Sequence, residues 1–333
     1  MDRKFVKRYW FLAGLILLIP VGILAPDAGI KIKDSGWVIP VFVGVMLCIA
    51  GFTMDTSNLI KQATNFRALL PVLGSIYVFS PIAAFGLAKL FAPTGNEDFL
   101  PAMMIMAAQA GSLASAIALT MLSGGNREFA LICTVMSNGI TFLLTPIILK
   151  ISIGADVAFQ VGEMMLRMVY MVLIPIIAGQ ILRKFLWDKT EFIRPVIRIM
   201  PQFIILMFVY TGFASGAVQL QNEAGLVLRF LAACALLHLF LLGLNTFISG
   251  LLGCKWPERT AMILSGSQKT LPNGIYVWNN FFPSNPYGAI PLVLYHLFQL
   301  VVDTLLVPFF VKKNPQCEKY MDDAPIMNCH QNK

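Results

Sequence analysis

Ten long apolar runs constrain this 333-residue chain more than any other feature of its sequence. A helix needs about 20 apolar residues to cross the hydrocarbon core of a bilayer, and each run is near that length. Hydrophobic residues make up 57% of the chain and charged residues only 13%, which excludes an ordinary soluble domain. The runs cover residues 9–25, 36–54, 69–92, 100–123, 128–150, 162–183, 199–217, 226–251, 259–282 and 288–311.

The distribution of Lys and Arg predicts the side of the membrane that each loop faces. If all ten runs are spans and the N-terminus is inside, eighteen of the 25 Lys and Arg residues lie in inside loops and tails, and six lie outside. Positive residues favour the cytoplasmic side of a membrane, so we expect both termini in the cytoplasm. The net charge of +8 then reflects topology and not a nucleic-acid partner.

The first run follows four basic residues, as in a signal peptide, but nine further runs favour a retained first helix. We therefore expect a multi-pass protein of the plasma membrane or of a bacterial inner membrane, with the lipid bilayer as its surroundings. Residues 314–333 are polar and are expected to form a cytoplasmic tail. The oligomeric state is left open.

The chain also repeats itself weakly. Segments that begin at Pro40, Ala102 and Leu143 match segments that begin 161, 159 and 162 residues later. Five spans in each repeat place the two halves in opposite orientations. We therefore predict an all-α membrane protein of ten transmembrane helices, built as two inverted five-helix repeats over residues 1–156 and 157–313. Transporters of this design have broken helices at corresponding positions and a binding site where the breaks meet.

The ninth run is interrupted by a polar stretch, Ser265–Gly274, with the sequence SGSQKTLPNG. Pro272 removes a backbone donor, and Asn273 and Gly274 tolerate non-helical dihedrals, so we expect the helix to break here. Lys269 lies near the bilayer midplane, where a charge costs about 2.5–3.5 kcal/mol on insertion scales. Irregular backbone survives in a membrane only inside protein or beside a wet cavity, which favours a solute or ion site. The alternative is a Pro-kinked helix whose lysine reaches outward.

The fourth run has a corresponding small and polar stretch, and the helix after each break has a polar stripe along one face. Ser, Thr and Asn in such stripes also hydrogen-bond between packed helices without binding anything. Asp303 and Lys269 are harder to explain that way, because each buried charge is costly without a partner. The candidate substrate- and ion-binding residues are Gln109, Ser112, Ser115, Thr134, Ser137, Asn138, Gln268, Lys269, Thr270, Asn273, His296, Gln299 and Asp303.

Other polar residues are assigned structural roles. His238 and Asn245 in the eighth run are interpreted as interhelical contacts, and Glu163 with Arg167 as an interfacial ion pair. The six cysteines are scattered without a CxxC motif, so we predict neither a disulfide nor a metal site. Cys329 and His330 in the tail leave a metal-binding pair as an open alternative. No cofactor is predicted, and Na⁺ or H⁺ is the candidate coupling ion.

These residues resemble the bile acid:sodium symporter superfamily. The broken fourth and ninth spans and Thr145-Pro146 are similar to that family in general, and Gly266–Pro272 is similar to its divergent branch around the seventh, orphan human member. The resemblance covers about residues 5–313. It implies a core of spans three to five and eight to ten that moves against a panel of spans one, two, six and seven. It also implies sodium-coupled secondary transport of an organic anion.

The sequence departs from the family at the positions that the resemblance assigns to sodium ligands. Three ligand residues are kept, namely Ser115, Thr134 and Gln268, and three are replaced, by Ala116, Ala130 and Leu264. A fixed ammonium, Lys269, stands beside Gln268. We expect it to occupy the space of a bound cation, satisfied by Ser115, Thr134 or Asp303, and to load and release a proton. The hypothesis is transport that needs Lys269 but not sodium, and is either proton-coupled or uncoupled.

Two other classes of function compete with transport. An intramembrane hydrolase needs a nucleophile and a base, and only Asp303 and His296 offer catalytic groups here, without an evident nucleophile. A membrane sensor or regulator with a transporter fold would bind a solute without flux. The sequence favours a secondary active transporter of a small organic anion and not an enzyme, and leaves the direction of transport open.

The predicted topology is tested by cysteine labelling in a cysteine-free background. Cysteines at Asn96 and at Thr190 should react from opposite sides of the membrane, because an odd number of spans separates their loops. A membrane-impermeant maleimide added outside should label position 96 and spare position 190. Equal labelling of both positions from outside would contradict the topology and the inverted repeat.

Overall fold

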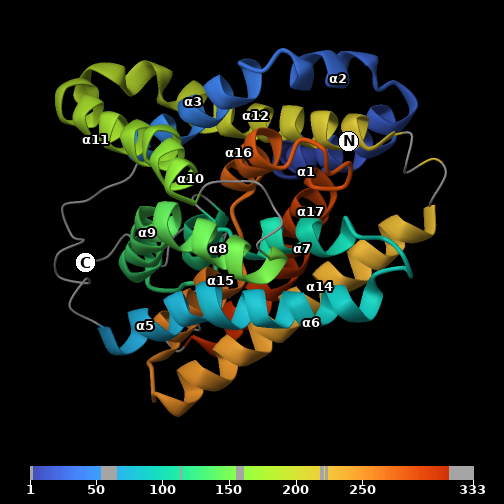
Figure 1. The fold of residues 1–333 in the computed structure, drawn as a ribbon. Coiled ribbons are helices and arrows are strands. Elements are labelled where there is room, and N and C mark those ends of the chain that lie inside the picture. The colour runs from blue at the N-terminus through green and yellow to red at the C-terminus, as the bar shows by residue number, and fades with distance from the viewer. Residues whose placement is uncertain are drawn as a thin grey trace.

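The computed structural model describes residues 3–53, 66–112, 115–154, 161–217, 221 and 224–314, and Figure 1 shows the arrangement of their helices. The predicted tail falls outside the described residues except for Asn314, and so do Cys329 and His330.

The described residues form helices and no strands, which confirms the all-α prediction. The elements of the first half are α1 (Arg3–Leu24), α2 (Asp27–Asp34), α3 (Val38–Thr53), α5 (Phe66–Gly74), η1 (Ser75–Phe79), α6 (Ser80–Phe91), α7 (Phe99–Ala107), α8 (Ser115–Leu122) and α9 (Arg127–Ile153). Those of the second half are α10 (Val161–Met168), η2 (Val169–Leu173), α11 (Ile174–Leu186), η3 (Asp188–Ile193), α12 (Arg194–Ser215), α14 (Ala224–Leu251), α15 (Trp256–Ser267), α16 (Leu271–Phe281) and α17 (Ala289–Lys313).

Five described helices are long and apolar enough to cross a membrane, and the bent pair α2–α3 makes a sixth if it is one span. The five are Phe66–Phe91, Arg127–Ile153, Val161–Leu186, Gly225–Leu251 and Ala289–Lys313. The fourth and ninth runs are each divided into two short helices, so neither half reaches the length of a span. The seventh run holds a shorter apolar helix, Ile199–Ser215. A count of ten spans stays a prediction.

The segment between the first two runs differs from the expected loop. Residues Asp27–Asp34 form helix α2, and α3 turns away from it by 80°. Asp27 lies in the first turn of α2, and Lys31 and Lys33 lie in its last turn. These charges complement the helix dipole, which stabilises a helix too short and too polar to be recognised by hydropathy.

The helices pack as two groups, which we call the panel and the core. The panel contains α1–α3 and α10–α12, and the core contains α5–α9 and α14–α17. In Figure 1 the panel lies along the top and the core fills the rest of the molecule, with α16 and α17 reaching toward the panel. This is the division that the family resemblance implied.

Small residues allow the closest contact within the panel, where α3 packs on α11. A Cβ atom on Gly179 would lie 2.1 Å from the backbone oxygen of Cys48, and one on Gly51 would lie 2.2 Å from that of Ile176. Only glycine permits backbones to approach this closely. The panel is therefore held together by backbone packing.

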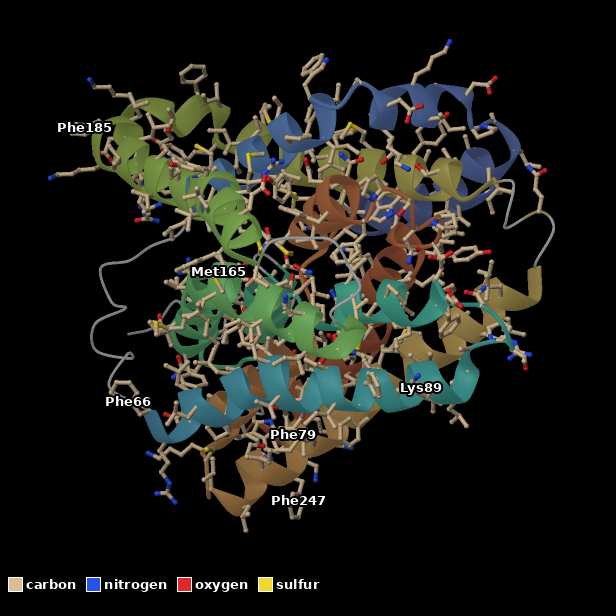
Figure 2. The ribbon with its side chains drawn as sticks, viewed as in Figure 1. Phe66, Phe79, Lys89, Met165, Phe185 and Phe247 are labelled. Atoms are coloured by element: carbon tan, nitrogen blue, oxygen red, sulfur yellow. The ribbon has the colours of Figure 1, made fainter. Side chains whose placement is uncertain are left out.

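Large apolar side chains cover the outside of the molecule. Phe79 and Phe247 are 42% and 68% exposed, and Figure 2 shows both at the lower surface of the core. Most of the buried polar side chains, by contrast, lie in the segments from α7 to α9 and from α14 to α17. An apolar exterior around a polar interior is the arrangement that a lipid environment requires.

Candidate functional site

The two predicted breaks meet in the interior of the core. The first separates α7 from α8, and the second separates α15 from α16. The Thr270 N–H donates a hydrogen bond of 2.9 Å to the Ala110 carbonyl, so backbone from one break pairs with backbone from the other. Gln268 and Thr270 have extended backbone, with ψ values of 150° and 133°. The approach of the two breaks, expected from the repeat, is present in the structure.

The second break is narrower than the polar stretch suggested. Only residues 268–270 leave the helix, and α16 begins at Leu271. Pro272 lies in the first turn of α16, where a missing N–H has no cost, so it begins a helix and does not break one. Gly274 is helical, and a Cβ there would lie 2.2 Å from Leu292 Cδ2, so close packing explains this glycine.

Lys269 is held by three backbone carbonyls. Its Nζ donates to the oxygen of Ile76 at 2.7 Å, of Ala107 at 2.8 Å and of Gln109 at 3.0 Å. The side chain is 2% exposed. The expectation that Ser115, Thr134 or Asp303 would satisfy the ammonium was wrong. We call the three oxygens the carbonyl cage.

Each cage oxygen lacks a backbone donor because helical hydrogen bonding is interrupted nearby; the Ala107 oxygen also accepts from Ser80 Oγ at 3.4 Å. Ala107 ends α7, and carbonyls in the last turn of a helix have no partner in that helix. Gln109 lies in the break itself. In the π-helix η1 the Ser80 N–H donates to the Ser75 carbonyl, five residues earlier. By the same spacing the donor to the Ile76 carbonyl would be residue 81, which is a proline and has no N–H. Pro81 therefore leaves the Ile76 oxygen for Lys269.

The backbone of Lys269 is fixed by Gln299 on α17. The Lys269 N–H donates to Gln299 Oε1 at 2.8 Å, and Gln299 Nε2 donates to the Lys269 carbonyl at 3.0 Å. His296 Nδ1 lies 3.0 Å from the same Nε2. An amide side chain thus replaces the helical partners that the break removes. This confirms that α17 presents its polar face to the second break.

Asp303 belongs to a different cluster from Lys269. Its Oδ2 accepts from Gln268 Nε2 at 2.6 Å, and its Oδ1 lies 2.9 Å from His238 Nε2. Gln268 Oε1 accepts from Ser115 Oγ at 2.6 Å, and Ser115 Oγ lies 2.5 Å from Ser112 Oγ. A hydrogen-bonded chain therefore runs from the first break through Gln268 to Asp303 and His238.

The polar face of α9 lines the first break. Asn138 donates to the Gly111 carbonyl at 3.0 Å, and Thr134 donates to the Ser112 carbonyl at 3.4 Å. Asn138 Oδ1 also lies 3.5 Å from Asn273 Nδ2 on α16. Ser137 takes part through its carbonyl, which accepts from the Tyr77 hydroxyl at 2.6 Å. Thr134, Ser137 and Asn138 thus make contacts from α9 to other segments of the core, and Asn138 reaches both breaks.

The sequence analysis missed several participants. His238 does contact another helix, as expected, but its partner is the one buried carboxylate of the described residues. Tyr295 and the Ile76 carbonyl were not considered. Other predicted residues contribute differently: Gln109 turns its amide to the Ile105 carbonyl and offers its backbone to Lys269, and Thr270 acts through its N–H. Among the described residues, no group of three or more His, Cys, Asp or Glu side chains is placed to hold a metal.

Comparison with known proteins decides the family. Residues 9–312 match the model of the SBF-like CPA transporter family. The chain belongs to this family. A sodium/bile acid cotransporter 7 of Danio rerio is 24% identical over 91% of this chain and 94% of its own length. The putative symporter YfeH of Escherichia coli is 25% identical, with 85% and 86% covered, and a Pseudomonas aeruginosa protein is 26% identical, with 95% and 96% covered.

Membership in an SBF-like transporter family makes this chain a multi-pass membrane transporter and not an enzyme. The positions that the resemblance associates with sodium are partly apolar in the structure. Ala116, Ala130 and Leu264 are buried and bring no side-chain oxygen to the core. Gln268, which is kept, uses both amide atoms within the cluster of Ser115 and Asp303.

A cavity of about 390 Å³ opens between the core and the panel of this transporter. Its core wall is the face of α9 that carries Asn138, and its panel wall is one face of η2 and α11. Lys184 lies at the end of the panel wall and is exposed. We call this cavity the groove. Its lining residues are Val135, Asn138, Gly139, Leu173, Ile176, Ile177, Gln180, Ile181 and Lys184.

Removal of the Lys269 ammonium should destabilise the core. Lys269→Met keeps the length of the side chain but leaves the Ile76 and Gln109 carbonyls without a donor and the Ala107 carbonyl with only the Ser80 hydroxyl at 3.4 Å. Each unmade buried hydrogen bond costs about 1–3 kcal/mol. Relief from burying a charge offsets part of this loss. We expect a lower apparent melting temperature in detergent, and no change for Lys89→Met, which alters an exposed lysine. Equal melting temperatures for both variants would show that the cage does not stabilise the fold.

Proposed function

We propose that this chain is a sodium-independent secondary transporter of a small organic anion. The observation that carries the proposal is the carbonyl cage. Three carbonyl acceptors require three N–H donors, and only the charged form of lysine has three. Lys269 is therefore an ammonium ion tied to the chain, at the place where the two breaks meet.

Unwound carbonyls between half-helices are the groups that hold coupling cations in transporters with broken helices. Here the ammonium engages these carbonyls and lies at the C-terminal end of α7, whose dipole favours a positive charge. A sodium ion would have to displace the Lys269 ammonium from these carbonyls. The loss of polar side chains at Ala116, Ala130 and Leu264 further supports a site that works without sodium.

The groove supports an organic anion as the substrate. Most of its lining residues are apolar, and Lys184 offers a positive charge at one end. An apolar pocket with few polar groups is the usual form of a small-molecule site. An anion with an apolar body fits it, with the anionic group toward Lys184. The relatives include a protein named for sodium and bile acid cotransport and a putative symporter, which supports transport over the sensor and hydrolase alternatives.

The proposal includes ten spans in two inverted repeats, with both termini in the cytoplasm. Two broken helices that face each other support the repeat. In Figure 2, Phe66 and Phe185, both next to predicted inside loops, lie toward the left edge, and Lys89, next to a predicted outside loop, lies toward the right. Lys184 adjoins Phe185, so this orientation opens the groove to the cytoplasm.

Uptake into liposomes tests sodium independence. The purified protein is assayed with a panel of radiolabelled organic anions that includes bile acids, in buffers of sodium or of choline. We expect equal uptake in both buffers, because Lys269 already provides the cation. Lys269→Gln should lose most of the flux, and Lys89→Gln should keep it. A native protein that stops when choline replaces sodium would refute the proposal, as would undiminished flux in Lys269→Gln.

A charge reversal in the groove tests its role in substrate binding. Lys184→Glu should raise the KM for the transported anion about tenfold or more, because an attraction of about 1.4 kcal/mol or more is lost or reversed. The matched control is Lys189→Glu, which alters an exposed lysine of η3 outside the groove lining. Equal KM values for the two variants would exclude Lys184 as the recognition charge.

A further inference from the structure

His238 and Asp303 form a fully buried pair that the carbonyl cage does not explain. His238 lies on α14 and Asp303 on α17, and both side chains have no exposed surface. The other buried ionisable side chains on the same two helices are Cys234 on α14 and Tyr295 and His296 on α17, and Lys269 follows Gln268, which donates to Asp303. Among these side chains, Lys269 is an ammonium ion whose three N–H groups all donate to backbone carbonyls.

The hydrogen-bond partners define where the protons of the pair lie. The Tyr295 hydroxyl is 2.6 Å from the Ser267 carbonyl and 3.3 Å from His238 Nδ1. A hydroxyl has one proton, and the shorter contact has the usual length of an O–H···O bond. The Ser267 carbonyl also ends α15 and needs a donor. Tyr295 therefore donates to Ser267, and a hydrogen bond between its oxygen and His238 requires the proton on Nδ1.

This assignment requires one more proton in the pair. With Nδ1–H fixed, Nε2 of a neutral imidazole carries only a lone pair, and it faces Asp303 Oδ1 at 2.9 Å. Two acceptors repel at that distance. A proton must lie between them, held either by the imidazolium or by the carboxylic acid, and the pair is then neutral in total.

After loss of that proton His238 has one N–H for two acceptors on α17, so it can donate to Tyr295 or to Asp303 but not to both. The freed carboxylate would still accept from Gln268, which is joined through Ser115 and Ser112 to the first break. A change of protonation at Asp303 thus acts on the side chains that connect both breaks. The fixed charge of Lys269 and the dissociable proton of the pair are separate features of the same core.

We propose that the His238–Asp303 pair is the proton-binding site that couples transport to a proton gradient. The inference rests on the proposed function and identifies the coupling ion as H⁺. The structure corresponds to the proton-loaded conformation, in which the groove is open. Deprotonation leaves His238 with one donor for its two partners on α17, and this change in hydrogen bonding shifts the core relative to the panel. No oxidant, metal or second ion takes part.

Asp303→Asn is the decisive variant, because it reproduces the proton-loaded pair. The amide introduced at position 303 can donate to His238 Nε2 and its oxygen can accept from Gln268, so every hydrogen bond of the structure is kept and the protein should fold. The control is Glu163→Gln, the same chemical change at an exposed carboxylate of the panel.

The first measurement is infrared difference spectroscopy of the purified full-length protein in lipid, stepped between pH 5 and pH 9 without any substrate. The wild type and Glu163→Gln should show the same carboxyl and imidazole bands, and Asp303→Asn should lose them. Bands that persist in Asp303→Asn, or a wild type without them, would overturn the proposal.

The second measurement is the reaction rate of a cysteine at Val135, in the groove wall, with a water-soluble thiol reagent. Rates are divided by those of a cysteine at Phe192, which is 82% exposed, to remove the effect of pH on the thiol. The ratio should fall as the pH rises in the wild type and in Glu163→Gln, and stay constant in Asp303→Asn. A ratio that changes equally in Asp303→Asn would refute the coupling. Failure of anion uptake would refute the proposed function alone, since neither readout uses a substrate.

Discussion

The core of this transporter depends on one buried ammonium and three carbonyl oxygens. Without Lys269, the interruptions at η1 and in the first break would each leave an unpaired carbonyl in the interior, and the carbonyl at the end of α7 would keep only the Ser80 hydroxyl at 3.4 Å. The three oxygens come from two segments of the first half, and the lysine comes from the second half. One side chain of the second half therefore donates to carbonyls of the first half and holds the two breaks together.

The sequence predicted the fold well where hydropathy and turn chemistry act locally. Helices end at Phe91 and Phe281 and begin again at Phe99 and Ala289, close to the gaps between the apolar runs, and both broken helices are interrupted where small polar residues gather. Helix α2 was missed because its stabilisation comes from charges at its ends and not from an apolar pattern. The width of the second break was overestimated because proline begins helices as readily as it ends them.

The partners of the candidate residues were harder to predict than the residues themselves. Lys269 was recognised as a buried charge, but backbone carbonyls have no signature in the amino-acid sequence, so side-chain acceptors were proposed instead. The nearest signal was Pro81, which removes the donor for Ile76. His238 lies on a helix without a break, and only the packing of α14 against α17 reveals that its ring faces Asp303. Contacts between distant segments are set by tertiary structure, which periodicity does not encode.

Two kinds of positive charge in one core have different physical consequences. All three N–H groups of the Lys269 ammonium donate to carbonyls, so the side chain keeps its charge as long as the cage is intact. Loss of the proton between His238 and Asp303 leaves one N–H of His238 for two acceptors, so it changes hydrogen bonding as well as charge. Gln268 lies beside both groups, since it precedes Lys269 and binds Asp303. Asn138 lies on the groove wall and contacts the first break through Gly111. Under the proposed coupling, a displacement at Gln268 would reach the first break through the hydroxyls of Ser115 and Ser112. The fixed charge then has a structural role and the mobile proton a switching role.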